Sequence, residues 1–324
     1  MTCIRCQYTT CKKFGYFGKR RIQRWRCTSC SSTFCEAHER LTRATIISNP
    51  DAAARAMQCL LEGCSIRSTE RLTGLNRNTI MRLLETVGAG CEKLLDAKLR
   101  GLNCRYVQCD EIRSFVGKKQ RQVRKGDGVE VGDQWIFVAL DAETKLVASY
   151  CIGKRSIANT MSFIGDLHKR LASQIQWTTD GFHFYTKAVP EVFGLDIDFA
   201  QLVKLFGDFG QHDEGRYSPP RITETISKVR IGNPSVRDIS TSYVERQTLT
   251  MRMQLRRLTR LTNAFSKKLA NLKAAVALHF TYYNFCRVRS SLRVTPAMEA
   301  GLTDHVSSIA DLVNSQVAPG SLAA

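Results

Sequence analysis

The sequence predicts a multidomain α/β protein in which a small cysteine-rich module and a helical segment precede a larger domain built on a mixed sheet. Three observations support this prediction. Four cysteines form two CxxC pairs near residue 1, apolar residues recur at helical spacing up to residue 100, and strand-like and helix-like stretches alternate beyond Gly101. We expect domains at residues 1–43, 44–100 and 101–304, followed by a flexible tail at 305–324.

The cysteine pairs have the spacing CxxC-x20-CxxC, at Cys3, Cys6, Cys27 and Cys30. This pattern is typical of one tetrahedral zinc site with four thiolate ligands, and a module this small needs a metal to fold. Two disulfides are the alternative, but the chain has thirteen cysteines, an odd number, and no secretory segment precedes the pairs. Three other residues could replace a zinc ligand, but none is needed while the two CxxC pairs suffice: Cys11, Cys35 and His38.

Charge narrows the class of partner. The 324 residues include 48 Lys and Arg against 29 Asp and Glu, a formal net charge of +19. Such an excess favours a polyanion. A membrane is a poor candidate, because no apolar run is long enough to span one and no basic amphipathic anchor is evident. We therefore expect a cytoplasmic protein that binds nucleic acid; a basic surface that serves only solubility is the alternative.

The helical segment has the pattern of a helix-turn-helix. Asn49 and Pro50 predict a helix start, a second short helix ends near Gly74, and Asn76 is a good cap for a third helix. The third helix has apolar residues at 80, 83, 84 and 87, which give it a buried face. An ordinary helical linker is the alternative. In a helix-turn-helix, the residues free to reach a major groove are Asn76, Arg77, Asn78, Thr79 and Arg82.

Beyond Gly101 we expect strands at 105–110, 134–141 and 146–152, a helix at 158–171 and a strand at 173–180. Three antiparallel strands, a helix and a further strand are the opening of a ribonuclease H-like fold. The glycines and prolines of 185–240 predict a short helix and strand with long loops. One long basic helix at 242–268 and a second helix at 271–285 complete the prediction.

Two carboxylates end predicted strands that should be neighbours, Asp110 on the first strand and Asp180 on the fourth. Carboxylates held this close repel one another unless a cation such as magnesium lies between them. Two such ions can activate a hydroxyl nucleophile and stabilise the leaving oxygen of a phosphodiester. We expect the third ligand from a later helix. Glu245 is the candidate, although the helix dipole alone favours an acid there; Glu224 is its rival, with Asp238 behind it.

Other polar residues near these strands have simpler interpretations. Glu111 follows Asp110, but adjacent strand residues face opposite sides, so only one of them can point into the site. Asp141 ends a strand at a hairpin, where aspartate is a common turn residue. His183 could touch DNA, and packing is the favoured alternative.

Cations outside the helix-turn-helix are candidate phosphate contacts. One group lies between the first two strands, where a solvated loop is the alternative, and the other follows Glu245 along the predicted basic helix. The residues are Lys118, Lys119, Arg252, Arg256, Arg257 and Arg260.

Three stretches carry a family resemblance: TTDGFHFY at 178–185, YVERQTLTMR at 243–252, and YNFCRVRSSL at 283–292 with the Thr-Pro at 295–296. They resemble bacterial insertion-sequence transposases of the InsA/InsB type. The resemblance covers nearly the whole chain, since that family also joins a zinc ribbon, a helix-turn-helix and a DDE catalytic domain. The resemblance implies that Asp110, Asp180 and Glu245 are the DDE triad. The sequence departs from the family's pattern at two places. The interval between Asp180 and Glu245 is longer than usual, which keeps Glu224 as a rival for the third ligand. Arg289 stands where related C-terminal tails often have histidine.

Together these observations predict a transposase with structural Zn²⁺ and catalytic Mg²⁺ or Mn²⁺. It would bind the terminal inverted repeats of an insertion sequence as a homo-oligomer on double-stranded DNA, cut the strand and join it to target DNA without a covalent enzyme intermediate. A zinc-containing helix-turn-helix transcription regulator with a non-catalytic C-terminal domain is the alternative from another class. A structure-selective nuclease shares the catalytic metals but not the strand transfer.

Overall fold

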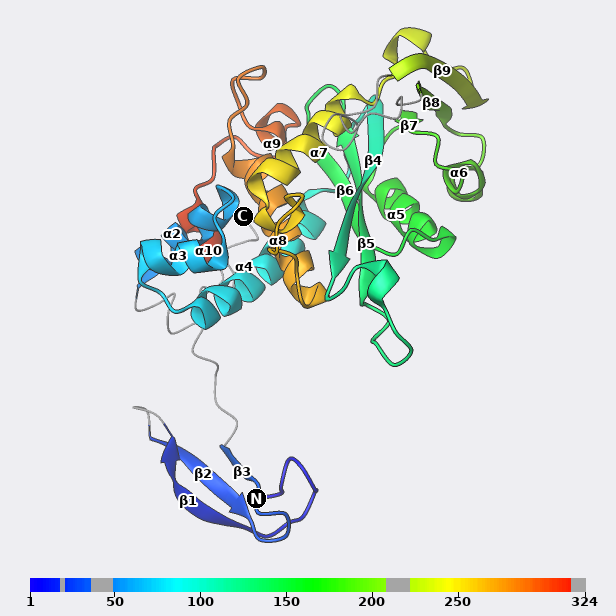
Figure 1. The fold of residues 1–324 in the computed structure, drawn as a ribbon. Helices are drawn as coiled ribbons and strands as arrows, with labels where there is room; N and C mark the ends of the chain where they lie inside the picture. Colours follow the sequence, from blue (N-terminus) through cyan, green and yellow to red (C-terminus); the bar gives the residue numbers. More distant parts are fainter. Residues whose placement is uncertain (18–20, 36–48, 208–221, 316–324) are drawn as a thin grey trace. The chain divides into compact units, whose positions relative to one another are not determined.

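The computed structural model describes residues 1–17, 21–35, 49–207 and 222–315. The chain forms two compact units, Met1–Thr45 and Ile46–Ala324 (Figure 1). The expected segments 44–100 and 101–304 therefore lie in the same unit, and their buried residues share one core.

The first unit is a three-stranded antiparallel sheet of β1 (Cys11–Phe17), β2 (Ile22–Cys27) and β3 (Thr33–Cys35). Its core consists of Cys3, Cys27 and Phe34, with Cys11 and Trp25 packed against it. Such a core removes little apolar surface from water, so the unit needs a further source of stability.

The second unit begins with three helices, α2 (Pro50–Leu61), α3 (Ile66–Thr73) and α4 (Arg77–Lys98). The side chains of Asn49, Ser65 and Asn76 accept hydrogen bonds from the first turns of these helices. Gly74 ends α3 with a positive φ of 71°, as a helix C-cap requires. The third helix is longer than the apolar pattern predicted, because its second half continues into the core.

Helix α4 packs closely on α8 (Leu269–Thr281) at Gly88. A Cβ atom at Gly88 would come within 2.6 Å of the backbone of Ala274, so only glycine fits there. This contact joins the N-terminal helices firmly to the rest of the unit.

The unit is built around a six-stranded mixed sheet in the order β6-β5-β4-β7-β8-β9. Strands β4, β5 and β6 are antiparallel, β7 and β8 run parallel to β4, and β9 returns antiparallel to β8. The neighbouring first and fourth strands agree with the prediction, and the order is consistent with a ribonuclease H-like sheet. The strands are β4 (Tyr106–Val116), β5 (Gly132–Asp141), β6 (Val147–Gly153), β7 (Gln176–Thr179), β8 (Asp198–Phe206) and β9 (Ile222–Ile231).

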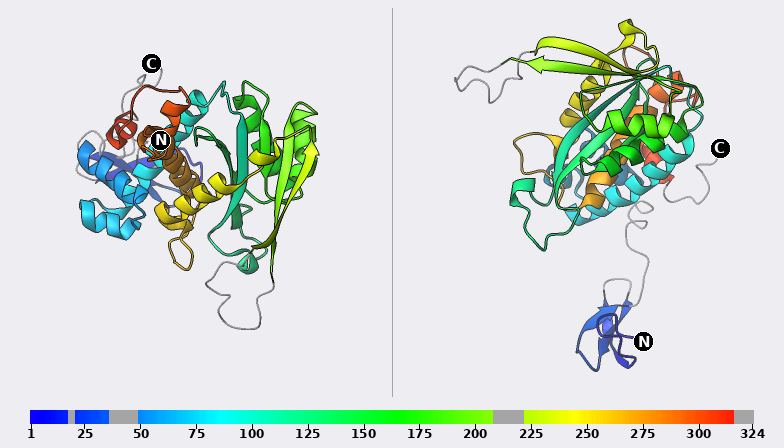
Figure 2. Two further views of the ribbon diagram at one scale, coloured as in Figure 1. Left: turned by 90° about the horizontal axis from the view of Figure 1, so that it is seen from above. Right: turned by 90° about the vertical axis from the view of Figure 1, so that its right-hand side faces the viewer.

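Helices cover both faces of this sheet (Figure 2). Helices α5 (Ile157–Arg170) and α6 (Tyr185–Phe193) lie on one face, where Phe137 of β5 contacts Phe163 of α5. Helices α7 (Ser242–Gln254) and α8 lie on the other, where Tyr150 of β6 contacts Phe280 of α8. The alternation of strand side chains therefore decides which helices each residue meets.

Several sequence expectations need correction. Strand β4 does not end at Asp110 but continues through alternating buried residues to Val116, paired throughout with β5. Strands β8 and β9 occupy much of the stretch expected as loops. The predicted helix at 242–268 stops at Gln254, since Leu255 and Leu258 turn into the core around a 3-10 turn, Arg256–Leu258.

The described residues that follow α8 are also more ordered than predicted. Helix α8 continues as a turn of π-helix, Tyr282–Cys286, before the short helix α9 (Pro296–Glu299). Helix α10 (Ile309–Asn314) buries Leu312 and Val313 and packs on α2, in a stretch expected to be flexible. No helix among the described residues is long and apolar enough to cross a membrane.

Candidate functional site

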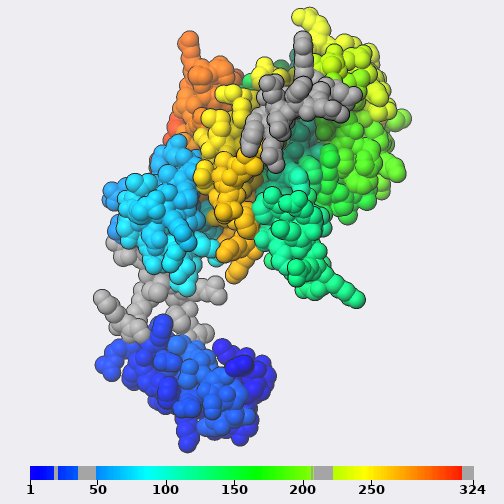
Figure 3. Space-filling view, in the orientation of Figure 1, coloured from blue at the N-terminus to red at the C-terminus, as the bar shows by residue number. Residues whose placement is uncertain are grey.

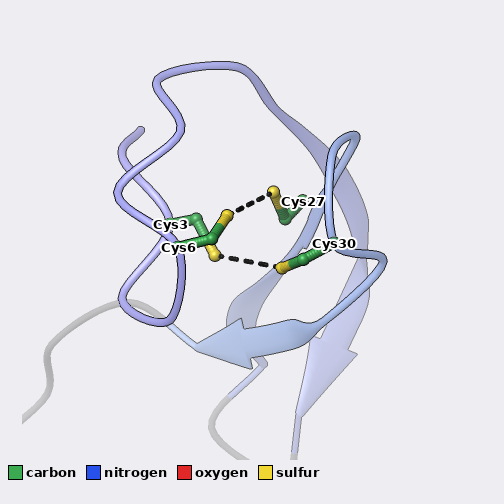
Figure 4. Close-up of side chains that lie close together, drawn as sticks. All are labelled: Cys3, Cys6, Cys27 and Cys30. Carbon is green, nitrogen blue, oxygen red and sulfur yellow. Dashed lines mark hydrogen bonds between the residues drawn. The ribbon is translucent and has the colours of Figure 1, made fainter.

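The N-terminal unit brings the four predicted zinc ligands together (Figure 4). The sulfur atoms of Cys3, Cys6, Cys27 and Cys30 all lie within 4.8 Å of one another, and the Cys3–Cys30 and Cys6–Cys27 pairs are each 3.6 Å apart. A tetrahedral site with Zn–S bonds of about 2.3 Å has sulfur–sulfur edges of roughly 3.8 Å. The donor set and its spacing therefore fit one zinc ion.

The thiol chemistry of this group also suits a cation. Hydrogen bonds from the side chain and backbone of Ser32 lower the pKa of Cys30 to about 6, and a backbone hydrogen bond from Cys30 lowers the pKa of Cys27. Both effects favour thiolates, the form that binds metal. The pKa of Cys6 moves the other way, to about 12, because a backbone hydrogen bond from Tyr8 is outweighed by hydrogen bonds with the other thiols and by burial. All thirteen cysteines are free in this structure, which gives the disulfide alternative no support. Cys11 and Cys35 lie outside the four-sulfur group, and His38 lies outside the described residues.

In the second unit, Asp110 and Asp180 lie at equivalent positions on neighbouring strands. The parallel register of β4 and β7 pairs Cys109 with Thr179, and each aspartate is the next residue along its chain. Asp110 accepts a hydrogen bond from the Glu111 backbone N–H at 2.8 Å and one from Thr248 at 3.3 Å. The Asp180 carboxylate accepts one from the backbone of Phe182 at 2.9 Å.

These two carboxylates are in an environment that disfavours their negative charge. Burial, followed by the charge of Asp180, raises the pKa of Asp110 to about 6, and the charge of Glu245 adds to the shift. Burial also raises the pKa of Asp180, again with a contribution from Glu245. Glu245 is thus close enough to both aspartates for its charge to matter.

Helix α7 is positioned by a residue that sequence reasoning missed. The side-chain oxygen of Gln108, two residues before Asp110 on the same face of β4, accepts hydrogen bonds from the backbone of Tyr243 and Val244 at 2.9 and 3.2 Å. This bond caps the start of α7 from the sheet. It places Glu245 one turn into a helix that crosses the face carrying Asp110.

The side chain of Glu245 is held by other partners. Its Oε1 atom accepts a hydrogen bond from Thr241 at 2.6 Å and forms an ion pair with Lys204 of β8. Within the described ranges, the four cysteines are the one group of at least three potential ligands whose atoms lie within 4.8 Å of one another. The three carboxylates are therefore near one another but not closed into a single metal site. Paired acidic oxygens of this kind still suit a divalent cation.

The alternatives to these residues lie elsewhere. Glu224 is exposed on the outer strand β9, opposite Leu205. Glu111 points to the opposite face of the sheet from Asp110, where it pairs with Arg155 at 2.8 Å. Burial, followed by the charge of Asp180, raises the pKa of Glu111 to about 7.

Two further polar residues have structural surroundings. Asp141 is buried and accepts hydrogen bonds from the backbone and hydroxyl of Thr144, which makes it a turn residue as expected. His183 is exposed, and its ring contacts Phe182 and Phe184.

Arg155 is a second residue that the sequence did not single out. Its guanidinium lies over the rings of Phe182 and Trp135, with its carbon 3.8 and 4.6 Å from the ring centroids. Its positive charge also opposes the rise in the pKa of Asp180. No local motif marks Arg155, because its partners come from distant parts of the sequence.

The candidate groove-facing residues of the helical segment are accessible. Asn76, Arg77, Asn78 and Arg82 are exposed on the first turns of α4, although the Asn76 side chain also accepts a hydrogen bond from the backbone of Asn78. Thr79 is half-buried. This exposure leaves the residues free to meet a ligand but does not identify one.

The other candidate cations lie in two separate parts of the second unit. Lys118 pairs with Asp127 at 2.7 Å, and its loop follows Val116, six residues of extended strand beyond Asp110, or about 20 Å away. This loop, which includes the exposed Lys119, does not lie beside the carboxylates. Arg252 is on α7, where burial and then the charge of Arg260 lower its pKa while the charge of Asp110 opposes the shift. The remaining three arginines follow the end of that helix: Arg256, Arg257 and Arg260.

No protein-family model matches the chain, and no curated protein matches it significantly. One similar solved structure, the Mos1 strand transfer complex, is 16% identical with a TM-score of 0.22 over 49% of this chain and 56% of that chain. Another, a piggyBac transposase synaptic complex with hairpin DNA, is 10% identical with a TM-score of 0.36 over 87% of this chain and 71% of that chain. TM-scores this low establish neither fold nor function for this chain.

Proposed function

We propose that this chain is a DDE transposase that cuts DNA at the ends of a mobile element and joins it to a target. The observation that carries the proposal is the convergence of three acids from separate elements: Asp110 on β4, Asp180 after β7 and Glu245 on α7. Their charges act on one another in a partly buried setting, and the charge of Arg155 offsets only part of the rise in the pKa of Asp180. Among the described residues, neither aspartate forms a salt bridge. Such an arrangement is unfavourable by itself and suits divalent metal.

The chain's own residues would hold the reacting groups. Asp110 and Asp180 would bind Mg²⁺ or Mn²⁺, and Glu245 would join them after exchanging its bond with Lys204. Thr248 and the Glu111 backbone fix the orientation of Asp110, while Gln108 fixes the start of α7. When bound, the ions supply Lewis-acid activation of an attacking hydroxyl and charge stabilisation at the leaving oxygen.

The same proposal assigns the remaining parts of the chain. The start of α4 would read the terminal inverted repeats in a major groove, and the zinc-bound N-terminal unit would assist binding. Arg252, Arg256 and Arg260 would contact phosphates without reading sequence. Synapsis of two element ends would require a homo-oligomer on DNA.

A cleavage assay with matched carboxylate variants tests this assignment. We expect Asp110→Asn, Asp180→Asn and Glu245→Gln each to abolish magnesium- or manganese-supported cutting and strand transfer while repeat binding stays intact, because binding depends on cations elsewhere. Glu224→Gln is the matched control and should cut normally.

The outcomes separate the alternatives. A Glu245→Gln variant that cuts while Glu224→Gln does not would show that the third ligand is misassigned. If all four variants cut like the wild type, the DDE mechanism is wrong. If the wild type binds repeats but never cuts, a regulator with a non-catalytic C-terminal domain is the better account.

A further inference from the structure

A cavity of about 630 Å³ lies within the second unit between the helical segment and the region that follows α7. Its walls come from the end of α2, α3, α4, the turn after α7, the stretch at 262–267 and α8. In Figure 3 the light-blue and cyan residues of the helical segment lie against the yellow and orange residues of this region. The cavity lies apart from the three carboxylates, none of which lines it.

The charges that line this cavity have one sign. Five basic residues contribute to its wall, and no Asp or Glu does: Arg67, Arg77, Arg256, Arg257 and Lys267. In the part of the chain that the structure describes, none of the five forms an ion pair. Like charges gathered without counter-charges favour an anionic ligand.

Arg257 makes the strongest case for an anion. Its guanidinium donates a hydrogen bond to Ser266 at 3.0 Å, and no carboxylate of the described residues pairs with it. Burial lowers the pKa of Arg257 to about 10. A guanidinium partly withdrawn from water without a counter-charge is costly, and a phosphate could satisfy its remaining donors.

The rest of the lining suits a planar ring with polar edges. Asn271 is 3% exposed, and its side-chain oxygen has no hydrogen-bond partner among the described residues. Phe265, held against Phe115 at 4.7 Å between ring centroids, offers an aromatic surface, and Leu60 and Met81 add apolar wall. Aromatic faces and amide groups are what nucleobases bind.

We propose that this cavity binds a nucleoside phosphate, with the phosphate on Arg257 and Arg256 and the base against Phe265 and Asn271. The volume lies within the roughly 300–1,000 Å³ of small-ligand sites, which suits a nucleotide rather than a duplex. An unpaired nucleotide in a DNA strand and a free mononucleotide share this chemistry. The site does not depend on the proposed cleavage reaction.

Direct binding by the full-length Asp110→Asn protein in zinc-replete buffer without magnesium or manganese tests the site separately from catalysis. Calorimetry would compare a single-stranded trinucleotide, the mononucleotides dAMP and dTMP, and inorganic phosphate. We expect a nucleotide probe to bind at least tenfold more tightly than phosphate. A preference for the trinucleotide would identify a DNA strand as the source, and equal binding of a mononucleotide would identify a free nucleotide.

Variants of the lining provide the controls. Arg257→Met should weaken nucleotide binding at least tenfold, because it removes the charge that holds the phosphate, and it should leave the fold intact, because that half-buried charge forms no ion pair among the described residues. Exposed Arg256→Gln should weaken binding several-fold and serves as a second variant, and Asn271→Leu should reduce the advantage of nucleotide over phosphate. Exposed Arg237→Met, outside the cavity, should change nothing. Equal binding of phosphate and nucleotides, no binding of any probe, or unchanged binding by both arginine variants would overturn the proposal.

Discussion

Replacing Asp110 with asparagine should stabilise the protein when no divalent catalytic ion is present. The aspartate is partly buried beside two other acids, and its pKa is raised from 3.8 to about 6. A native-state pKa above the unfolded value means that the folded protein binds more protons between these two values, so stability falls as pH rises through that window. The shift corresponds to about 3 kcal/mol at pH 8 and roughly half of that at pH 5.

The expected net gain for Asp110→Asn at pH 8 is about 1–3 kcal/mol, because asparagine keeps only part of the hydrogen bonding to Glu111 and Thr248. Urea unfolding of the full chain, followed by tryptophan fluorescence in zinc-replete buffer without magnesium or manganese, measures it. The gain should shrink at pH 5, and manganese should stabilise the wild type but not the variant.

Exposed Asp196→Asn is the matched control and should change stability little at either pH. An Asp110→Asn protein no more stable than the wild type at pH 8 would refute the reasoning. So would a gain of the same size at pH 5 and pH 8, since protonation would then have no part in it.

Three further predictions concern other parts of the chain. Cys27→Ser should remove zinc from the purified protein and unfold the N-terminal unit while the second unit keeps its urea transition; metal analysis with retained zinc would contradict this. Arg77→Ala and Arg82→Ala should each reduce discrimination between repeat and non-repeat DNA by about 1–3 kcal/mol in competition binding, and unchanged selectivity would exclude the start of α4 as the reader. Lys204→Met should lower the magnesium concentration for half-maximal cleavage by roughly two- to fivefold, because a partly exposed ion pair no longer competes for Glu245; an unchanged magnesium titration would refute that competition.

The positions of several strands and helices along the chain were predictable because they depend on local patterns. Alternating apolar residues and turn residues are visible in the sequence, and they placed β5, β6 and α5 within a residue or two of their observed bounds. The ends of elements were less predictable. Asp110 looked like the end of a strand, but pairing with β5 carries β4 six residues further.

Contacts across long separations account for most of what was missed. Lys204 and Glu245 are 41 residues apart, and Gln108 and Tyr243 are 135 apart, so no spacing rule connects them. The early end of α7 is also determined by tertiary contacts that no local pattern marks. No proline or glycine marks it, and the burial of Leu255 and Leu258 in the core determines it.

The close packing of α4 on α8 has a geometric consequence for DNA. One 22-residue helix, about 33 Å long, presents Arg77 at its start and is locked at Gly88 into the unit that carries the acids. Under the proposed function, the distance from the recognised bases to the cut phosphodiester is then fixed by a rigid rod rather than by a flexible connection. The position of Arg77 on this fixed helix would therefore determine the distance along the DNA between the binding sequence and the cut.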